Sequence, residues 1–146
     1  MKILFIIIAG MILLSGCSTE LVTDRKLPRV IGEDYCLVNI VREPRFVGSM
    51  VALMIQLDGD DLLHIGNGDC VKFKIPSGAN EIALSASAAW TGLPVRKRIK
   101  FNGEKMQSYY FYVREDAGKS GPEFRQLSKK DWDEMSKSCN WISIEK

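Results

Sequence analysis

The sequence predicts a mainly β protein, a small antiparallel β-sandwich of about seven or eight strands with one short helix near the C-terminus. Two observations support this fold class: short β-prone runs recur along the chain, and turn-forming dipeptides separate them. Several short strands at this spacing are typical of sandwiches and barrels. The expected strands are 36–43, 49–57, 61–65, 70–75, 80–88, 95–101 and 106–114.

The turns are predicted from dipeptides that tolerate a positive φ. Asp58-Gly59, Asn67-Gly68 and Asn102-Gly103 each lie between two β-prone runs, so we expect three hairpins. Pro76-Ser77-Gly78 is expected to form a fourth turn that ends one strand and starts the next, since proline presets φ and glycine accepts the left-handed region.

The C-terminal part of the chain predicts a short helix and a last strand. Ser128, followed three residues later by Asp131, resembles a helix N-cap. The helix is expected to run to about Lys137, with Trp132 and Met135 on the face that packs against a sheet. A strand over 140–144 follows.

The N-terminus resembles an export signal. Met1-Lys2 precedes an apolar run over 3–14, which is shorter than the ~20 residues that cross a membrane as a helix. Leu14-Ser15-Gly16-Cys17 then resembles the lipobox of bacterial lipoproteins. That resemblance implies cleavage before Cys17 and a diacylglycerol on its sulfur. The alternative is an ordinary signal peptide with Cys17 as a plain thiol.

This resemblance divides the chain into a signal peptide over 1–16, a lipidated tether over 17–34 and a single domain over 35–146. Lipoproteins with Asp after the cysteine are typically held at the inner membrane, so Ser18 favours the outer membrane. Removal of residues 1–16, whose only charge is on Lys2, leaves 130 residues with 19 basic and 18 acidic side chains. This balance favours no strongly charged partner, and export excludes most nucleic acids.

Three cysteines follow Cys17, and an exported protein meets an oxidising compartment where disulfides persist. Cys36 shares its strand parity with apolar residues and is expected in the core. Cys70 and Cys139 lie on the opposite parity to their apolar neighbours, so we expect them to pair. The alternative is three free thiols. A zinc site is not expected, because no C-x-x-C spacing occurs and His64 is the only histidine, and no cofactor is expected.

A series of motifs resembles an uncharacterised group of small bacterial lipoproteins, domain-of-unknown-function family 2846. The resemblance covers about residues 36–127 and implies a transthyretin-like or similar β-sandwich, with no catalytic residues to transfer. The chain departs from the pattern where Ser77 splits the usual P-G turn, and no family feature follows Tyr112. The matching motifs are Arg42, Phe46-Val47-Gly48-Ser49, Leu57-Asp58-Gly59, Asn67-Gly68, Pro76-Ser77-Gly78 and Tyr109-Tyr110.

Two candidate sites have simpler structural explanations. Asp58, Asp60 and Asp61 offer carboxylates of the kind that bind calcium, but an acidic hairpin tip has the same residues. His64 has the pKa range of a general base, but no accompanying Ser-His-Asp or Cys-His motif is recognisable. We therefore expect no catalytic residues and no metal ligands.

Possible partner contacts are Trp90, Arg96 and Arg98. Trp90 lies in an expected loop, where a tryptophan contacts a partner or a membrane interface or packs over the sandwich end. Arg96 and Arg98 belong, with Lys97 and Lys100, to a basic run that fits anionic lipid headgroups or protects a sheet edge from aggregation. The aromatic run 109–112 fits either a stacking platform or a packed strand.

The expected function is that of a non-enzymatic binding or structural module of the cell envelope. It would be anchored to the membrane by its N-terminal lipid, facing the periplasm from the outer membrane, with an envelope protein as a further partner. One alternative is an immunity or inhibitor lipoprotein that blocks a toxin or cell-wall hydrolase. The other is an envelope hydrolase that uses Asp58, Asp60 or His64.

Overall fold

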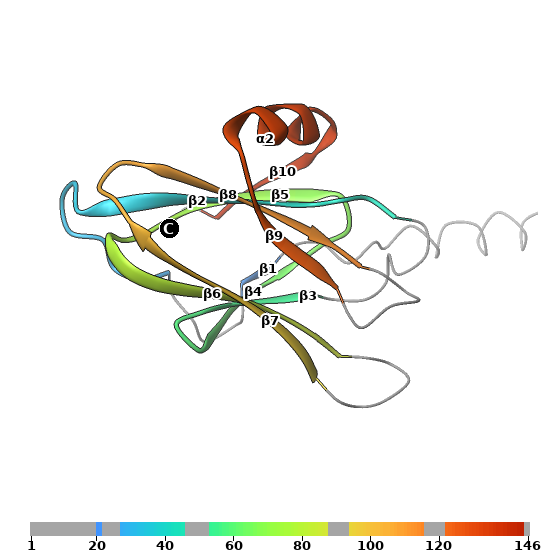
Figure 1. Ribbon diagram of the computed structural model, residues 1–146, viewed down its shortest axis with the longest axis horizontal. Coiled ribbons are helices and arrows are strands. Elements are labelled where there is room, and N and C mark those ends of the chain that lie inside the picture. Colours follow the sequence, from blue (N-terminus) through green and yellow to red (C-terminus); the bar gives the residue numbers. More distant parts are fainter. Residues whose placement is uncertain (1–19, 22–26, 46–52, 88–93, 116–121, 145–146) are drawn as a thin grey trace, which may run out of the picture.

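The protein is a β-sandwich, as predicted (Figure 1), but its described part contains ten strands in two five-stranded sheets, whereas about seven or eight strands were expected. The computed structural model describes residues 20–21, 27–45, 53–87, 94–115 and 122–144. The first sheet contains, in order, β1 (Glu20–Leu21), β4 (Asp60–Ile65), β3 (Leu53–Leu57), β6 (Gly78–Ser87) and β7 (Pro94–Gly103). The second contains β10 (Asn140–Ser143), β5 (Asp69–Pro76), β2 (Tyr35–Arg42), β8 (Ser108–Arg114) and β9 (Glu123–Leu127).

The core lies between the sheets and follows from the alternation of side chains along each strand. In β5, Val71, Phe73 and Ile75 are buried, whereas Lys72 and Lys74 are exposed. The buried residues of β2, β3, β4 and β6 join the same cluster, together with Phe111 and Val113 of β8. Cys36 is completely buried in this core with a free thiol, as its parity predicted.

The second sheet is mixed, which corrects the expectation of an antiparallel sandwich. β2 pairs in parallel with β8, and β10 pairs in parallel with β5. The two strands of each pair are far apart in the sequence. Between them the chain forms strands of the other sheet, and before β10 it also forms helix α2. Side-chain alternation is the same in parallel and antiparallel strands, so the pattern alone does not distinguish them.

One of the three expected hairpins is present. Asp58 and Gly59, with φ of 50° and 92°, join the paired strands β3 and β4. Asn67-Gly68 lies between β4 and β5, which belong to different sheets, so this turn crosses the sandwich. The turn predicted at Asn102-Gly103 is wrong, because both residues belong to β7 and pair with β6. The chain reverses later, where Met106 has a φ of 60°.

The remaining turn and the helix agree with the sequence. Gly78 has a φ of 109° after Pro76-Ser77, and this turn carries the chain from β5 to β6. Helix α2 (Lys129–Met135) begins after Ser128, whose Oγ accepts a 3.1 Å hydrogen bond from the backbone N–H of Asp131. It ends in the 3₁₀ helix η2 (Ser136–Ser138).

Helix α2 covers the outer face of the second sheet (Figure 1). Trp132 is buried there beside the ring of Tyr110, with centroids 5.3 Å apart. A small second core forms under the helix from Val41, Cys70, Tyr112, Leu127 and Trp132. The aromatic run 109–112 is therefore a packed strand, with Tyr110 and Tyr112 facing this second core and Phe111 facing the main one.

The folded part begins before Tyr35, where the domain was expected to start. Glu20 pairs with His64 and Leu21 pairs with Leu63, so β1 forms an edge of the first sheet inside the segment expected to be a tether. Leu27 also packs against the main core. The signal sequence and Cys17 lie outside the described residues and stay predictions.

The two ends of the sandwich differ in charge. We call residues 42–45, 65–69, 94–96, 113–115 and 122–123 the arginine end, which contains four basic and four acidic residues. We call residues 31–34, 58–61, 76–78 and 103–107 the acidic end, which contains six acidic residues and one lysine. The arginine end lies on the right in Figure 1.

Candidate functional site

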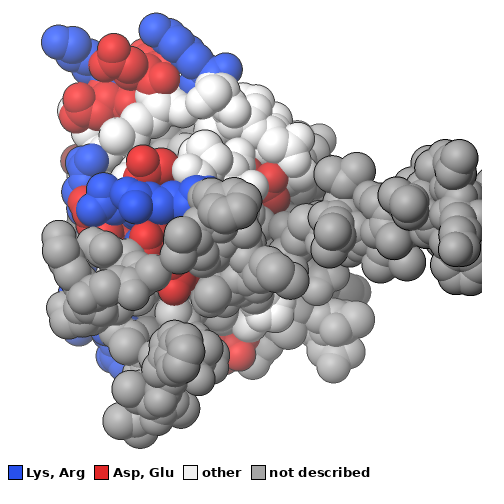
Figure 2. Space-filling view, turned by 90° about the vertical axis from the view of Figure 1, so that its right-hand side faces the viewer, with Lys and Arg blue, Asp and Glu red and all other residues white. Residues whose placement is uncertain are grey.

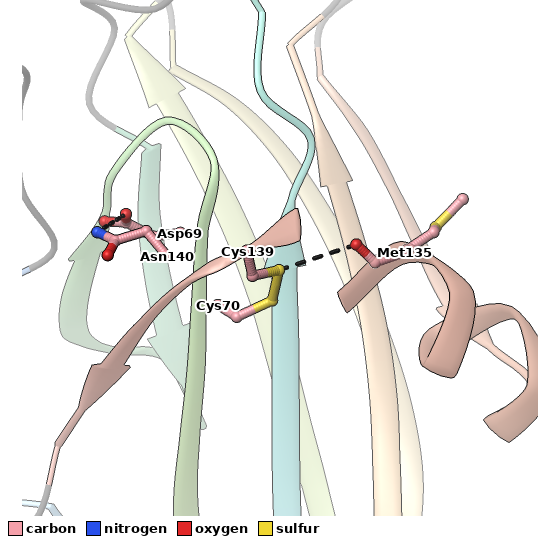
Figure 3. The surroundings of a disulfide bond; sticks show 5 residues. All are labelled: Asp69, Cys70, Met135, Cys139 and Asn140. Atoms are coloured by element: carbon pink, nitrogen blue, oxygen red, sulfur yellow. Dashed lines mark hydrogen bonds between the residues drawn. A yellow bond between two sulfur atoms is a disulfide. The ribbon is translucent and has the colours of Figure 1, made fainter. Parts of the chain in front are cut away.

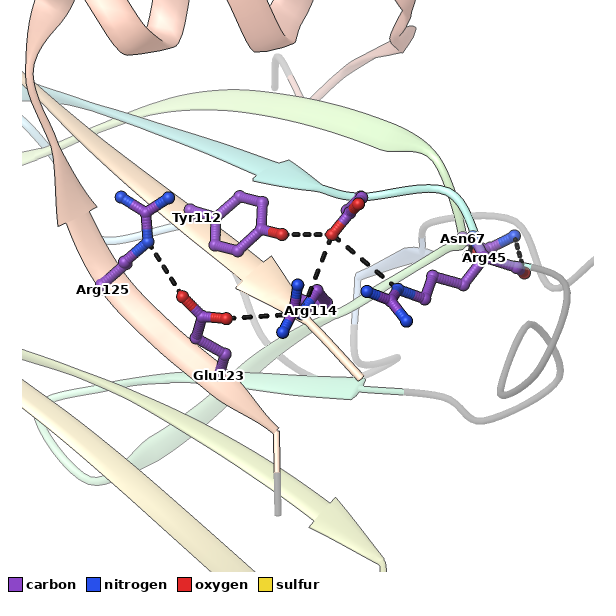
Figure 4. Close-up of polar contacts among 7 residues, drawn as sticks. Arg45, Asn67, Tyr112, Arg114, Glu123 and Arg125 are labelled. Carbon is purple, nitrogen blue, oxygen red and sulfur yellow. Dashed lines mark hydrogen bonds and ion pairs between the residues drawn. The ribbon is translucent and has the colours of Figure 1, made fainter. Parts of the chain in front are cut away.

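The candidate site is a charged network on the outer face of the second sheet, at the arginine end (Figure 4). Its residues are placed by strand register. Tyr112 pairs with Arg125 and Arg114 pairs with Glu123 across β8 and β9. Because alternate residues share a face, Tyr112, Arg114, Glu123 and Arg125 project to the same side of the sheet. Glu43 joins them from the end of β2, which runs beside β8.

Two glutamates hold the network together. The Tyr112 hydroxyl donates a hydrogen bond to Glu43 Oε2. The same oxygen lies 3.8 Å from Arg45 Nε and 3.9 Å from Arg114 Nε. Glu123 Oε2 lies 3.3 Å from Arg114 Nε, and its Oε1 accepts a 3.0 Å hydrogen bond from Arg125 Nε. The strand β8 is thereby connected to both of its neighbours at the arginine end.

The network holds its tyrosine in the neutral form. Burial raises the pKa of Tyr112 to about 12, and the hydrogen bond to Glu43 and the charge of Glu43 act in the same direction. The guanidinium of Arg125 lies over the ring, with Cζ 4.7 Å from its centroid. Three arginines face two glutamates here, so the cluster has a formal excess of one positive charge and a phenol that donates at neutral pH. Guanidinium groups form charge-assisted hydrogen bonds with carboxylates and phosphates, and here the two glutamates supply the carboxylates.

A cavity adjoins the network. It has a volume of about 310 Å³ and lies between the end of β2 and the segment that follows helix α2. Glu43 and Tyr112 line one side, while Glu134, Met135 and Cys139 line the other. The site therefore combines a small recess with charged groups at its margin. Figure 2 looks onto this end and shows acidic and basic side chains intermingled on its described part.

The disulfide predicted from strand parity is present and supports this recess. Cys70 and Cys139 are bonded, with Cα atoms 5.5 Å apart (Figure 3). Next to it, Asn140 Nδ2 donates a 2.9 Å hydrogen bond to Asp69 Oδ1, and Cys139 Sγ lies 3.9 Å from the carbonyl oxygen of Met135. The bond thus fixes the C-terminal segment, and with it one wall of the cavity, to the start of β5.

Arg45 is held by its backbone as well as by its side chain. Its N–H donates a 2.9 Å hydrogen bond to Asn67 Oδ1, and its carbonyl oxygen accepts one of 3.0 Å from Asn67 Nδ2 (Figure 4). Asn67, expected in a hairpin, therefore connects the segment after β2 to the turn between the sheets. Gly68 supports this approach, because a Cβ there would lie 3.3 Å from Pro44 Cβ.

The predicted partner contacts do not lie in this network. Arg96 and Arg98 belong to β7, which is an edge strand of the first sheet. This position fits the interpretation that the basic run protects a sheet edge from aggregation. Arg98 and Lys100 both form ion pairs with Glu81, at 3.4 and 3.7 Å. Arg96 is exposed near the arginine end. Trp90 lies outside the described residues.

The acidic tip and the histidine do not form a joint site. Asp58 is bonded to the strand β6, because its Oδ1 accepts a 2.7 Å hydrogen bond from the Glu81 N–H. Asp61 Oδ1 accepts one of 2.5 Å from Gln56 Nε2. His64 is half-buried on β4 beside β1. Across the described part of the chain, no group of three or more His, Cys, Asp or Glu side chains is placed to hold a metal ion.

Sequence reasoning missed the network because its members come from three strands. The available signal was the alternation Tyr112-x-Arg114 and Glu123-x-Arg125 on either side of one connection. The strand over 123–127 was not predicted, so the facing pairs were not recognised.

Comparison with known proteins gives no relatives: no family model, no curated protein and no solved structure matches the chain. The resemblance to domain-of-unknown-function family 2846 therefore stays a prediction from motifs. The fold and site define a small disulfide-bonded β-sandwich with an arginine-rich end. Among the described residues, no helix is both long and apolar enough to cross a membrane.

Proposed function

We propose that the chain is an exported bacterial lipoprotein, anchored by lipid on Cys17, whose sandwich is a non-enzymatic binding or structural module of the envelope. The observation that carries this proposal is the order Leu14-Ser15-Gly16-Cys17 after the apolar run 3–14. Several acyl chains on one residue hold a protein durably at a membrane, since each buried methylene contributes ~0.8 kcal/mol.

The Cys70–Cys139 disulfide supports export. Disulfides persist in oxidising compartments such as the periplasm and are rare in the cytosol. The bond joins a strand of the sandwich to the C-terminal segment, so it is a structural element of the fold.

The chemistry of the charged network supports binding. Arginines stay protonated, and Tyr112, with a pKa of about 12, stays protonated as well. Groups that do not exchange protons near neutral pH orient an anionic partner and transfer no proton to it. The network therefore fits recognition of phosphate or carboxylate groups of an envelope component.

Metabolic labelling with a fatty-acid analogue, followed by membrane fractionation, tests the proposal. The wild-type protein should be labelled, should begin at Cys17 by mass spectrometry and should sediment with membranes. Cys17→Ala should lose the label and become soluble, whereas Ser15→Ala, a substitution in the same motif that keeps a small residue, should behave as wild type. A wild-type protein that retains its first sixteen residues, or is unlabelled and soluble, would contradict the proposal.

The proposed location is the outer membrane. Ser18→Asp should move the labelled protein to inner-membrane fractions in a density gradient. A wild-type protein found with the inner membrane would contradict this part.

A further inference from the structure

The distance between the proposed anchor and the folded domain is short. β1 begins at Glu20, only three residues after Cys17, and Glu20 is paired with His64. A fully extended chain spans at most ~3.6 Å per residue, so the Cys17 backbone lies within about 11 Å of Glu20. β6 and β7 each have ten residues and are therefore about 33 Å long. The anchor thus lies close to one region of the sandwich, and a free tether of 18 residues is excluded.

The pairing register shows which end this is. β1 and β4 are antiparallel, with Glu20 opposite His64 and Leu21 opposite Leu63. The N-terminal end of β1 therefore lies beside the C-terminal end of β4, whose last residue is Ile65. Ile65 belongs to the arginine end, where its carbonyl oxygen accepts a hydrogen bond from Arg42. Because Cys17 is only three residues from Glu20, its attachment point is limited to the neighbourhood of the arginine end.

Charge favours the same orientation. The acidic end carries Glu33, Asp34, Asp58, Asp60, Asp61 and Glu104 against Lys105 alone. Anionic lipids repel this end, whereas the balanced arginine end offers Arg45, Arg96 and Arg114 to their phosphates. The repulsion also disfavours a domain lying flat on the edge formed by β1 and β4, because Asp60 and Asp61 are exposed at the far end of β4.

We propose that the arginine end is a membrane-docking surface: the short link from Cys17 to β1, which contains only Ser18 and Thr19, holds it against the anionic phospholipid surface that carries the anchor, with the acidic end pointing away. This orientation rests on the proposed lipidation of Cys17. It makes Arg45, Arg96 and Arg114 headgroup contacts of the anchored protein, in addition to their roles within the fold.

The test uses the lipidated protein purified from membranes, in which Cys17 is blocked, Cys36 is buried and Cys70 is bonded to Cys139. Arg96→Cys at the arginine end and Lys105→Cys towards the acidic end form a matched pair, because each removes one basic residue from an exposed position. Each new thiol receives a nitroxide. The protein is reconstituted in phosphatidylethanolamine–phosphatidylglycerol vesicles that contain a nickel-chelating lipid, and spin relaxation is measured.

The label at position 96 should relax several-fold faster than the label at position 105. Ten glycine and serine residues inserted after Ser18 should remove most of this difference, because they lengthen the link without disturbing β1. Equal relaxation at both positions, or faster relaxation at 105, would overturn the orientation. Mass spectrometry of the purified protein separates the two proposals: absence of lipid on Cys17 refutes the proposed function, whereas a lipidated protein with equal relaxation refutes only the docking surface.

Discussion

Arg42 Nη1 donates a 2.7 Å hydrogen bond to the carbonyl oxygen of Ile65, and so joins the end of β2 in one sheet to the end of β4 in the other. The arginine side chain is only 1% exposed. Burial raises the pKa of the Glu115 carboxyl, while the positive charge of Arg42 acts against this rise. The Ile65 carbonyl group and the Glu115 carboxyl are polar groups that offset the cost of burying the Arg42 charge.

Arg42→Met should lower the free energy of unfolding by about 1–3 kcal/mol, since it leaves a buried carbonyl group without its donor. Arg45→Met is the control: its side chain is partly exposed and forms a 3.8 Å ion pair, which contributes less than about 1 kcal/mol. Urea denaturation measures both. Equal midpoints for the two variants would show that the connection between the sheets does not depend on Arg42.

Removal of the disulfide by the double substitution Cys70→Ala and Cys139→Ala should lower the free energy of unfolding by about 4 kcal/mol. The bond closes a loop with a sequence separation of 69 residues and so restricts the unfolded chain. Thermal unfolding with and without a reductant measures the effect. The reductant should lower the midpoint of the wild type and leave that of the double variant unchanged. An insensitive wild type would refute a structural role.

Stability should fall between pH 10 and pH 12. The folded pKa of Tyr112 is raised to about 12 from an ordinary value of 10.0, so the stabilisation is complete below pH 10 and is lost as the pH rises through 12. This difference in pKa corresponds to about 2–3 kcal/mol, reduced here because Glu43 is partly exposed. Tyr112→Phe should remove the part of this pH dependence that Tyr112 causes and leave the part from Cys36, whose pKa is also raised by burial, whereas Tyr110→Phe on the same strand should keep both parts. Denaturation midpoints across this range, with tyrosinate absorbance, provide the measurement.

Glu43→Gln should lower the pKa of Tyr112, since it removes the charge that opposes ionisation. Burial contributes most to the raised pKa and is unchanged, so part of the rise should persist. If the pKa of Tyr112, measured by tyrosinate absorbance, is the same in this variant as in the wild type, Glu43 does not contribute to the raised pKa.

Gly103→Ala should destabilise the protein by about 1–3 kcal/mol through overpacking. A Cβ at this position would lie 2.5 Å from the Sγ of Cys36 in the core. Cys36→Ala removes that sulfur, so the double variant should cost less than the sum of the two single variants. A double-mutant cycle of unfolding free energies tests this, and strict additivity would argue against the contact.

The sandwich and most of its strands follow from the sequence, because side-chain alternation and turn residues are local properties. The limits of β5 differ from the expected 70–75 by only one residue at each end. The cysteine pairing also followed from alternation. The alternation places Cys70 and Cys139 on the face of the second sheet that helix α2 covers, and it places Cys36 on the opposite face, so only Cys70 and Cys139 could pair.

Properties that depend on which strands meet were not predictable. The dipeptide Asn67-Gly68 favours a positive φ at Gly68, and this φ is 77° in the structure. The same turn can join two paired strands of one sheet or two strands of different sheets, so the dipeptide does not predict which strands it joins. The network around Glu43 depends on the parallel pairing of β2 with β8, which are far apart in the sequence. No local sequence pattern predicts such a pairing, so the network that depends on it could not be predicted either.

The isolation of Cys36 has a consequence for how the protein forms its disulfide. Its sulfur is sealed in the core behind Gly103, and burial raises the pKa of its thiol, which reduces the reactive thiolate. Once the two sheets have closed on each other, Cys36 is enclosed between them, whereas Cys70 and Cys139 lie on the other face of the second sheet, under helix α2. Closure of the sheets therefore separates Cys36 from the two cysteines that pair.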